Sequence, residues 1–205
     1  MLKRPLVRQA PNDVHGTFAR VSSASGGETP TAGVKVLCLV DGLATAEASR
    51  TCVLLWRKSV NETRFQIQRE AIEYIVERYP GEASILCVIE PTSEPPPQAL
   101  REAAAALLTK LGPQLRCVAF VIEGSGFRAA MIRGVLSGIE FLRRSTYPTR
   151  YFAEVGRAAA WVASETGGQS MLLADAAHRL RDRLTALDDV ETPRFSGPAP
   201  RRPNA

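Results

Sequence analysis

The sequence has little of the chemistry on which many catalytic sites depend. Its 205 residues include only two histidines, His15 and His178, and 6% aromatic side chains. A serine nucleophile needs a nearby base, yet His15 lies in a segment without hydrophobic periodicity, and His178 lies on a charged helical face beside Asp175, Arg179 and Asp182. We therefore expect neither a serine hydrolase nor another enzyme.

Cysteine is also too scattered to suggest a site. Cys38, Cys52, Cys87 and Cys117 are far apart in the sequence, and each lies within an apolar run. Zinc ligands usually occur in pairs a few residues apart, and secreted disulfide frameworks have denser cysteines. These features predict four reduced core thiols, no bound metal and a cytoplasmic protein.

Long apolar runs and a local excess of charge are missing as well. No stretch approaches the ~20 apolar residues of a membrane-spanning helix, and residues 1–10 lack the continuous apolar segment of a signal peptide. The net charge is +5, of which residues 1–33 and 191–205 contribute +2 each, so that residues 34–190 carry only +1. We expect no membrane insertion and no binding of nucleic acid.

What the sequence does contain is a regular alternation of strands and helices between two polar ends. Residues 1–32 and 190–205 are predicted to be disordered, because they mix Pro, Gly, Ser and Arg without sustained periodicity. The length between them suits one domain at residues 33–166, followed by an appended helix at residues 168–189.

The segment from Arg116 to Leu142 is the centre of this pattern. Six consecutive apolar residues, Cys117–Ile122, predict a strand that is buried on both faces. Apolar residues then recur with helical period from Phe127 to Leu142, after the turn Gly124-Ser125-Gly126. A strand that leads into a helix through glycines is half of a βαβ unit.

The other elements extend the alternation into an α/β fold. We predict further strands at residues 34–40, 51–58, 84–89 and 149–153, with the first two paired antiparallel, and helices at residues 61–79, 98–111, 155–165 and 170–187. The expected architecture is a single domain with a mixed, mostly parallel sheet of about five strands, helices on both faces and a C-terminal amphipathic helix. The apolar stripe of that last helix must be buried, either on the domain or in a homodimer.

Two glycines interrupt the helix that follows the central strand. Gly134 and Gly138 each cost ~1 kcal/mol relative to alanine within a helix. We interpret them as a site of close backbone packing, against a neighbouring element of the same domain or against a second subunit.

The order of these elements resembles a known superfamily. Together with Arg150-Tyr151-Phe152 leading into Ala158–Val162, it is similar to the SpoIIAA-like branch of the STAS superfamily over residues 34–165. Gly156 and Arg157 stand where that branch often has an acidic pair. The resemblance implies a non-enzymatic regulatory or interaction module that docks a protein partner.

The same resemblance reaches the CRAL-TRIO lipid-binding fold. It therefore keeps a second possibility open, a binding protein for an apolar small molecule or lipid. The size of any cavity separates the two functions, since an apolar pocket of several hundred Å³ favours the ligand-binding protein and a filled core favours the docking module.

Two loops are candidate sites. Phosphorylated STAS regulators present a serine to a kinase partner in an Asp-Ser-Ser-Gly-Leu loop at a helix N-terminus. The similar residues here are Glu123, Gly124, Ser125, Gly126, Phe127 and Arg128, and a weaker second loop contains Thr92 and Ser93, at the place in the strand order where those regulators have their serine.

The residues of the first loop allow two roles for Ser125. It caps the following helix, or the loop is phosphorylated, docks a partner or holds an anion at the helix N-terminus, where Arg128 would add charge. No cofactor is expected, because a dinucleotide-binding G-x-G-x-x-G motif would require glycine at Ala129.

Overall fold

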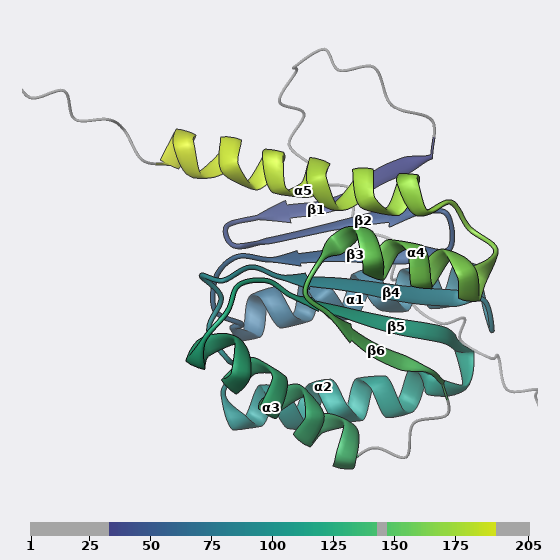
Figure 1. Cartoon of the computed structure of the whole chain (residues 1–205), viewed down its shortest axis with the longest axis horizontal. Coiled ribbons are helices and arrows are strands. Elements are labelled where there is room, and N and C mark those ends of the chain that lie inside the picture. Colours follow the sequence, from purple (N-terminus) through teal and green to yellow (C-terminus); the bar gives the residue numbers. More distant parts are fainter. Residues whose placement is uncertain (1–32, 143–146, 192–205) are drawn as a thin grey trace, which may run out of the picture.

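Six strands lie side by side in the order in which they occur in the chain (Figure 1). The structure is a computed structural model that describes residues 33–142 and 147–191. The first two pairings of the sheet are antiparallel and the other three are parallel. The strands are β1 (Val34–Val40), β2 (Leu43–Ala48), β3 (Thr51–Trp56), β4 (Ala83–Ile89), β5 (Leu115–Ile122) and β6 (Thr149–Phe152).

Helices cover both faces of this sheet, as predicted. The described helices are α1 (Glu62–Arg78), α2 (Gln98–Leu111), the short 3-10 helix η2 (Gly112–Gln114), α3 (Phe127–Leu142), α4 (Val155–Thr166) and α5 (Ser170–Glu191). One core cluster lies between the sheet and α1, α2 and α3, and a second lies between the sheet and α4 and α5 (Figure 1). The molecule is therefore a three-layer α/β structure.

Local sequence explains the ends of α1. The Asn61 side chain accepts a hydrogen bond from the backbone N–H of Arg64 at 2.9 Å, which caps the first turn. The helix ends before Pro80-Gly81, where Gly81 has a φ of +77° that suits glycine.

The central strand is confirmed. β5 lies between β4 and β6, and Val121 and Ile122 are fully buried. All seven residues of β4 are buried as well, as expected for parallel strands that are covered on both faces.

The predicted start of the sheet is wrong. The strand β2 lies between β1 and β3 and pairs antiparallel with both, so the predicted direct pairing of residues 34–40 with 51–58 does not occur. Two-residue loops, Asp41-Gly42 and Ser49-Arg50, make the two hairpins. The sheet therefore has six strands instead of about five, and it is less parallel than predicted.

The composition of β2 explains why this strand was not predicted from the sequence. Its sequence Leu-Ala-Thr-Ala-Glu-Ala is poor in the β-branched and aromatic residues that favour strands. Its alanines belong to the core cluster of α4 and α5, where small side chains let a helix approach the sheet closely. These residues are Ala44, Ala46 and Ala48, all with 0% exposure.

Helix α5 lies across the N-terminal half of the sheet (Figure 1). Its stripe is buried in the second core cluster through Leu173, Ala176, Ala177, Leu180 and Leu184. The stripe thus packs within the chain, which leaves it covered and not free for a second copy. The two ends that were predicted to be disordered lie outside the described residues, apart from Val190 and Glu191, which close α5.

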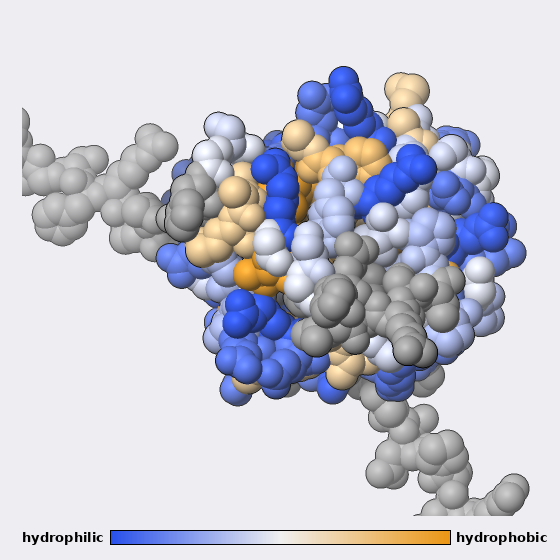
Figure 2. Space-filling view, turned by 60° about the horizontal axis from the view of Figure 1, so that its bottom comes forward, coloured by the Kyte–Doolittle hydropathy of each residue, from blue (hydrophilic) through white to orange (hydrophobic). Residues whose placement is uncertain are grey.

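The described surface is mostly polar. Hydrophilic side chains cover much of the side shown in Figure 2, with smaller apolar areas between them. The large apolar side chains that are exposed among the described residues are Met131, Met171 and Val190. None of the described helices combines the length and the apolar character that crossing a membrane requires.

Gly134 and Gly138 do not have the predicted close neighbour within the described chain. A Cβ atom at either position would meet no atom within 4 Å. Both glycines line an open groove between α2 and α3.

Candidate functional site: the carboxyl edge of the parallel strands

Three loops meet at one edge of the sheet because β3, β4 and β5 are parallel. Arg57 follows β3, Glu90 follows β4 and Glu123 follows β5. In open α/β sheets this carboxyl edge is where ligands usually bind. This edge of the sheet is therefore a candidate site.

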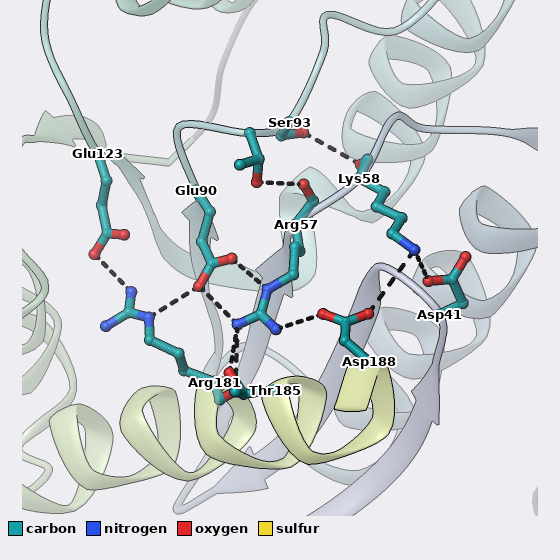
Figure 3. A network of polar contacts seen from close by, with 10 residues as sticks. Asp41, Arg57, Lys58, Glu90, Ser93, Glu123, Arg181, Thr185 and Asp188 are labelled. Atoms are coloured by element: carbon teal, nitrogen blue, oxygen red, sulfur yellow. Dashed lines mark hydrogen bonds and ion pairs between the residues drawn. The ribbon is translucent and has the colours of Figure 1, made fainter. Parts of the chain in front are cut away.

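A network of ion pairs joins this edge to α5 (Figure 3). Glu90 accepts hydrogen bonds from Arg57, with Nε–Oε2 at 2.7 Å and Nη2–Oε1 at 3.3 Å, and from Arg181 Nε at 2.9 Å. Arg181 Nη2 also donates to Glu123 at 2.7 Å, and Arg57 Nη1 donates to Asp188 at 2.9 Å. Two arginines thus bridge three carboxylates.

The electrostatics of this network indicate a structural role. Burial of Glu90 opposes its ionisation, but the hydrogen bonds from Arg57 and Arg181 outweigh that effect and hold its pKa below the ordinary value of 4.5. All five charged side chains of the network are engaged with one another. The network fastens α5 to the ends of the parallel strands.

The structure brings the two predicted candidate loops together. Gly124 has a φ of +86°, and a Cβ atom there would lie 3.2 Å from the side chain of Pro91, in the loop that follows β4. Gly124, Ser125 and Gly126 are exposed, and Glu123 is held by Arg181. The two loops form one surface beside the N-terminus of α3.

The hydroxyl groups of the second loop are used inside the protein. Thr92 donates a hydrogen bond to the carbonyl of Arg57 at 2.7 Å, and Ser93 donates to the carbonyl of Lys58 at 3.3 Å. Ser93 is only 2% exposed. Ser125 is therefore the accessible serine of the pair, while the side chains of Phe127 and Arg128 lie outside the described residues.

An apolar pocket that the sequence did not predict lies beside the second loop. Trp56, Cys87 and Phe120 of the sheet form its floor. Its volume is about 100 Å³, and it is bounded by α1, α2, α3 and the loop that contains Ser93 and Glu94. Neighbouring apolar side chains from the walls are Phe65, Leu100, Ala104 and Ile132.

The pocket has few polar groups. Trp56 Nε1 donates a hydrogen bond to Gln68 Oε1 at 3.1 Å, which satisfies the indole and fixes its ring in the floor of the pocket. Glu94 is the only charged residue among the described residues that line the pocket, and it accepts a hydrogen bond from Ser59 at 2.9 Å. The interior therefore suits an apolar group.

Its volume limits what it can hold. Sites for drug-sized ligands usually measure roughly 300–1,000 Å³, and an apolar cavity of about 150 Å³ holds one benzene molecule. A volume of about 100 Å³ therefore matches a single apolar side chain or a fragment of similar size. It is smaller than the several hundred Å³ expected of a binding protein for lipids.

The sequence held no direct signal for this pocket. Its lining residues fall on strands and helices that were predicted, and Pro95-Pro96-Pro97 marks the loop that borders it. The cavity itself depends on how α2 and α3 pack over the sheet, which local patterns do not specify.

Other candidate groups have ordinary structural environments. The four cysteines are free, and burial raises the pKa of the Cys87 thiol to about 12, so it stays protonated. His178 is exposed, and His15 lies outside the described residues. Within the part of the chain that the structure describes, no three His, Cys, Asp or Glu residues are grouped to hold a metal ion.

The chain was also compared with known proteins. No protein-family model and no curated protein matches it. The similarity to the STAS superfamily therefore stays a prediction, and function is inferred from the pocket and the two loops.

Proposed function

We propose that this chain is a non-enzymatic protein-interaction module that docks its partner at the carboxyl edge of the sheet. The observation that supports this function is the small apolar pocket, which is bordered by Ser93 and Glu94 of the loop whose Pro91 lies against Gly124. Protein interfaces concentrate their binding energy in a few anchor side chains that fill such pockets. In this proposal, the partner inserts one apolar side chain between α1, α2 and α3.

The loop at Ser125 regulates this docking, in keeping with the STAS-like prediction. Ser125 is exposed and lies two residues before α3, a 16-residue helix. A phosphate there gains from the positive end of the helix dipole, so the fold tolerates it. It also adds about two negative charges beside Glu123, at the rim of the docking surface, and so repels a partner that fits the unmodified loop.

The second candidate function is binding of a small apolar molecule in the same pocket. The nearly uniform apolar lining favours it. The volume restricts such a molecule to about the size of benzene, and a lipid would require α2 or α3 to move.

Filling the pocket tests both functions. Ala104 lines the pocket, so Ala104→Leu places three more carbon atoms in it with little loss of helix propensity. Ala106 is exposed on the same helix and does not line the pocket, so Ala106→Leu is the matched control. Proteins and small molecules captured by the wild type and both variants are quantified together by mass spectrometry.

The expected result is a protein partner that Ala106→Leu retains and Ala104→Leu loses by at least about tenfold, since losing one anchor typically costs 2 kcal/mol or more. Identical capture by both variants would show that the pocket is not the docking site. A small molecule that only Ala104→Leu fails to carry would support the second function instead.

The regulatory role of Ser125 has its own test. Ser125→Asp is expected to melt close to the wild type but to lose the partner that Ser125→Ala keeps. Equal affinity of both variants for the partner would reduce Ser125 to a helix cap.

A further inference from the structure

We propose that residues 192–205 of the same chain occupy the apolar pocket, with Phe195 as the anchor, so that a partner must displace them. This inference rests on the proposed function, since it takes the pocket to be the docking site. The occupant follows from where this segment leaves the described structure, from its reach and from its chemistry.

The last turn of α5 is linked to the rim of the pocket through Lys58. Asp188 Oδ1 is 3.8 Å from Lys58 Nζ, and the carbonyl of Lys58 accepts a hydrogen bond from Ser93, a lining residue (Figure 3). The next residue, Ser59, donates to Glu94, which also lines the pocket. The described chain therefore ends, at Glu191, near the edge of the sheet on which the rim lies.

The other undescribed end starts far away. Gly33 lies against Leu172 in the first turn of α5, since a Cβ atom at Gly33 would be 3.1 Å from that side chain. A helix of 22 residues is about 33 Å long, so residues 1–32 join the fold near the opposite end of α5. The position of the pocket thus favours residues 192–205.

Phe195 can reach the pocket. It follows Glu191, the last residue of α5, by four positions, and four extended residues span up to about 14 Å. Lys58 contacts both Asp188 and Ser93 at the rim, and we infer that the segment after Glu191, extended further by the Phe195 side chain, passes around this edge of the sheet to the pocket.

The chemistry of the segment matches the pocket. Phe195 is its only aromatic residue, and its three arginines, with no acidic residue, give a net charge of +3. Glu94 is the only charged residue among the described residues that line the pocket, and Arg194 adjoins Phe195. An aromatic ring enters the apolar interior while a cation faces the single carboxylate at the rim.

Because Phe195 is tethered to the same chain, we expect it to compete with a partner for the pocket measurably but weakly. A short tether gives an effective concentration of the order of mM. If the anchor alone binds with a dissociation constant near 1 mM or somewhat lower, it weakens a competing ligand by about two- to tenfold. A partner with a better anchor can then still displace it.

Photo-crosslinking tests the occupant directly. The full chain carries p-azidophenylalanine, which adds only an azide to the ring, in place of Phe195 and is irradiated at low concentration. We expect crosslinks within one chain to the segments that contain Val60, Leu100 and Ala104. These crosslinks should be weakened by Ala104→Leu and unchanged in Ala106→Leu.

A binding measurement separates this inference from the proposed function. The probe is benzene, whose size the pocket can hold, and we expect Phe195→Ala in the full chain to bind it about two- to tenfold more tightly than the wild type, while Ala104→Leu binds it less. An unchanged probe affinity, crosslinks outside the pocket, or crosslinks only between two chains would overturn the inference. If the partner nevertheless distinguishes Ala104→Leu from Ala106→Leu, the docking function stands without it.

Discussion

Glu90 connects three elements because its two carboxylate oxygens accept hydrogen bonds from two guanidinium groups. Its side chain is 10% exposed, and its partners come from the end of β3 and from α5. Glu90→Gln removes the negative charge and leaves Arg57 and Arg181 close together without their shared carboxylate. We expect it to lower the free energy of unfolding by about 2–4 kcal/mol, measured by urea denaturation.

The control for this variant is Glu154→Gln. Glu154 pairs with Arg157 at 3.6 Å, and both side chains are largely exposed. Its loss should change stability by less than about 0.5 kcal/mol. Equal effects of the two substitutions would mean that the network at Glu90 contributes no more than a surface pair.

Glu90 also makes the stability of the protein depend on pH in the acid range. The pKa of Glu90 is lowered in the folded state because the two arginines outweigh the effect of burial, so its stabilisation is present above the unfolded pKa, ordinarily 4.5, and is lost as the pH falls through the folded pKa. The unfolding free energy of the wild type should therefore decrease below about pH 5 more steeply than that of Glu90→Gln. The pKa of Asp41 is lowered by its hydrogen bond to Lys58, so Asp41 contributes part of the pH dependence of stability in both the wild type and Glu90→Gln.

This network was not predictable from the sequence. The positions of Glu90 and Arg181 are separated by 91 residues, and those of Arg57 and Asp188 by 131. Charged residues that are so far apart carry no local pattern, and only the parallel order of β3, β4 and β5 brings them to one edge. In contrast, the candidate loop at Ser125 was predictable, because glycines after an apolar strand and before a helical period mark such a turn locally.

At the scale of elements, helices and central strands were predictable and β2 was not. The strand β5 and the helix α3 follow from a continuous apolar run and a helical period. The sequence of β2 instead suits the narrow space beneath α5, where packing overrides the weak strand propensity of alanine. The Asp41-Gly42 pair was a usable hairpin signal, since such pairs commonly connect two strands directly.

This explanation of β2 predicts the effect of a larger side chain. Ala46 is fully buried in the cluster that includes α5, so Ala46→Leu should push α5 away from the sheet and destabilise the protein by about 1–3 kcal/mol. Chemical denaturation measures the change. The exposed substitution Ala186→Leu on α5 itself should remain within about 0.5 kcal/mol of the wild type, and an equally stable Ala46→Leu would contradict close packing over β2.

At the scale of the whole molecule, α5 is an integral layer of the fold and not an appended helix. It covers the sheet opposite α1 through Leu180 and Leu184, and it supplies Arg181 and Asp188 to the edge network. The predicted boundary between residues 33–166 and an appended helix coincides with Gly167, which ends α4 with a φ of +68°. The two parts nevertheless share the second core cluster, between the sheet and α4 and α5.

Two truncated chains test the contribution of α5 to the stability of the fold. A chain that ends at Gly168 leaves the alanines of β2 and the apolar residues of β3 uncovered, and Glu90 loses Arg181. We expect it to aggregate or to melt without cooperativity, because the buried surface it loses is large against a total stability of ~5–15 kcal/mol. A chain that ends at Glu191 keeps both core clusters and should melt within about 5 °C of the full chain. Circular dichroism melting and size-exclusion chromatography compare the two, and cooperative unfolding of the shorter chain at the wild-type temperature would show that the remaining layers are stable without α5.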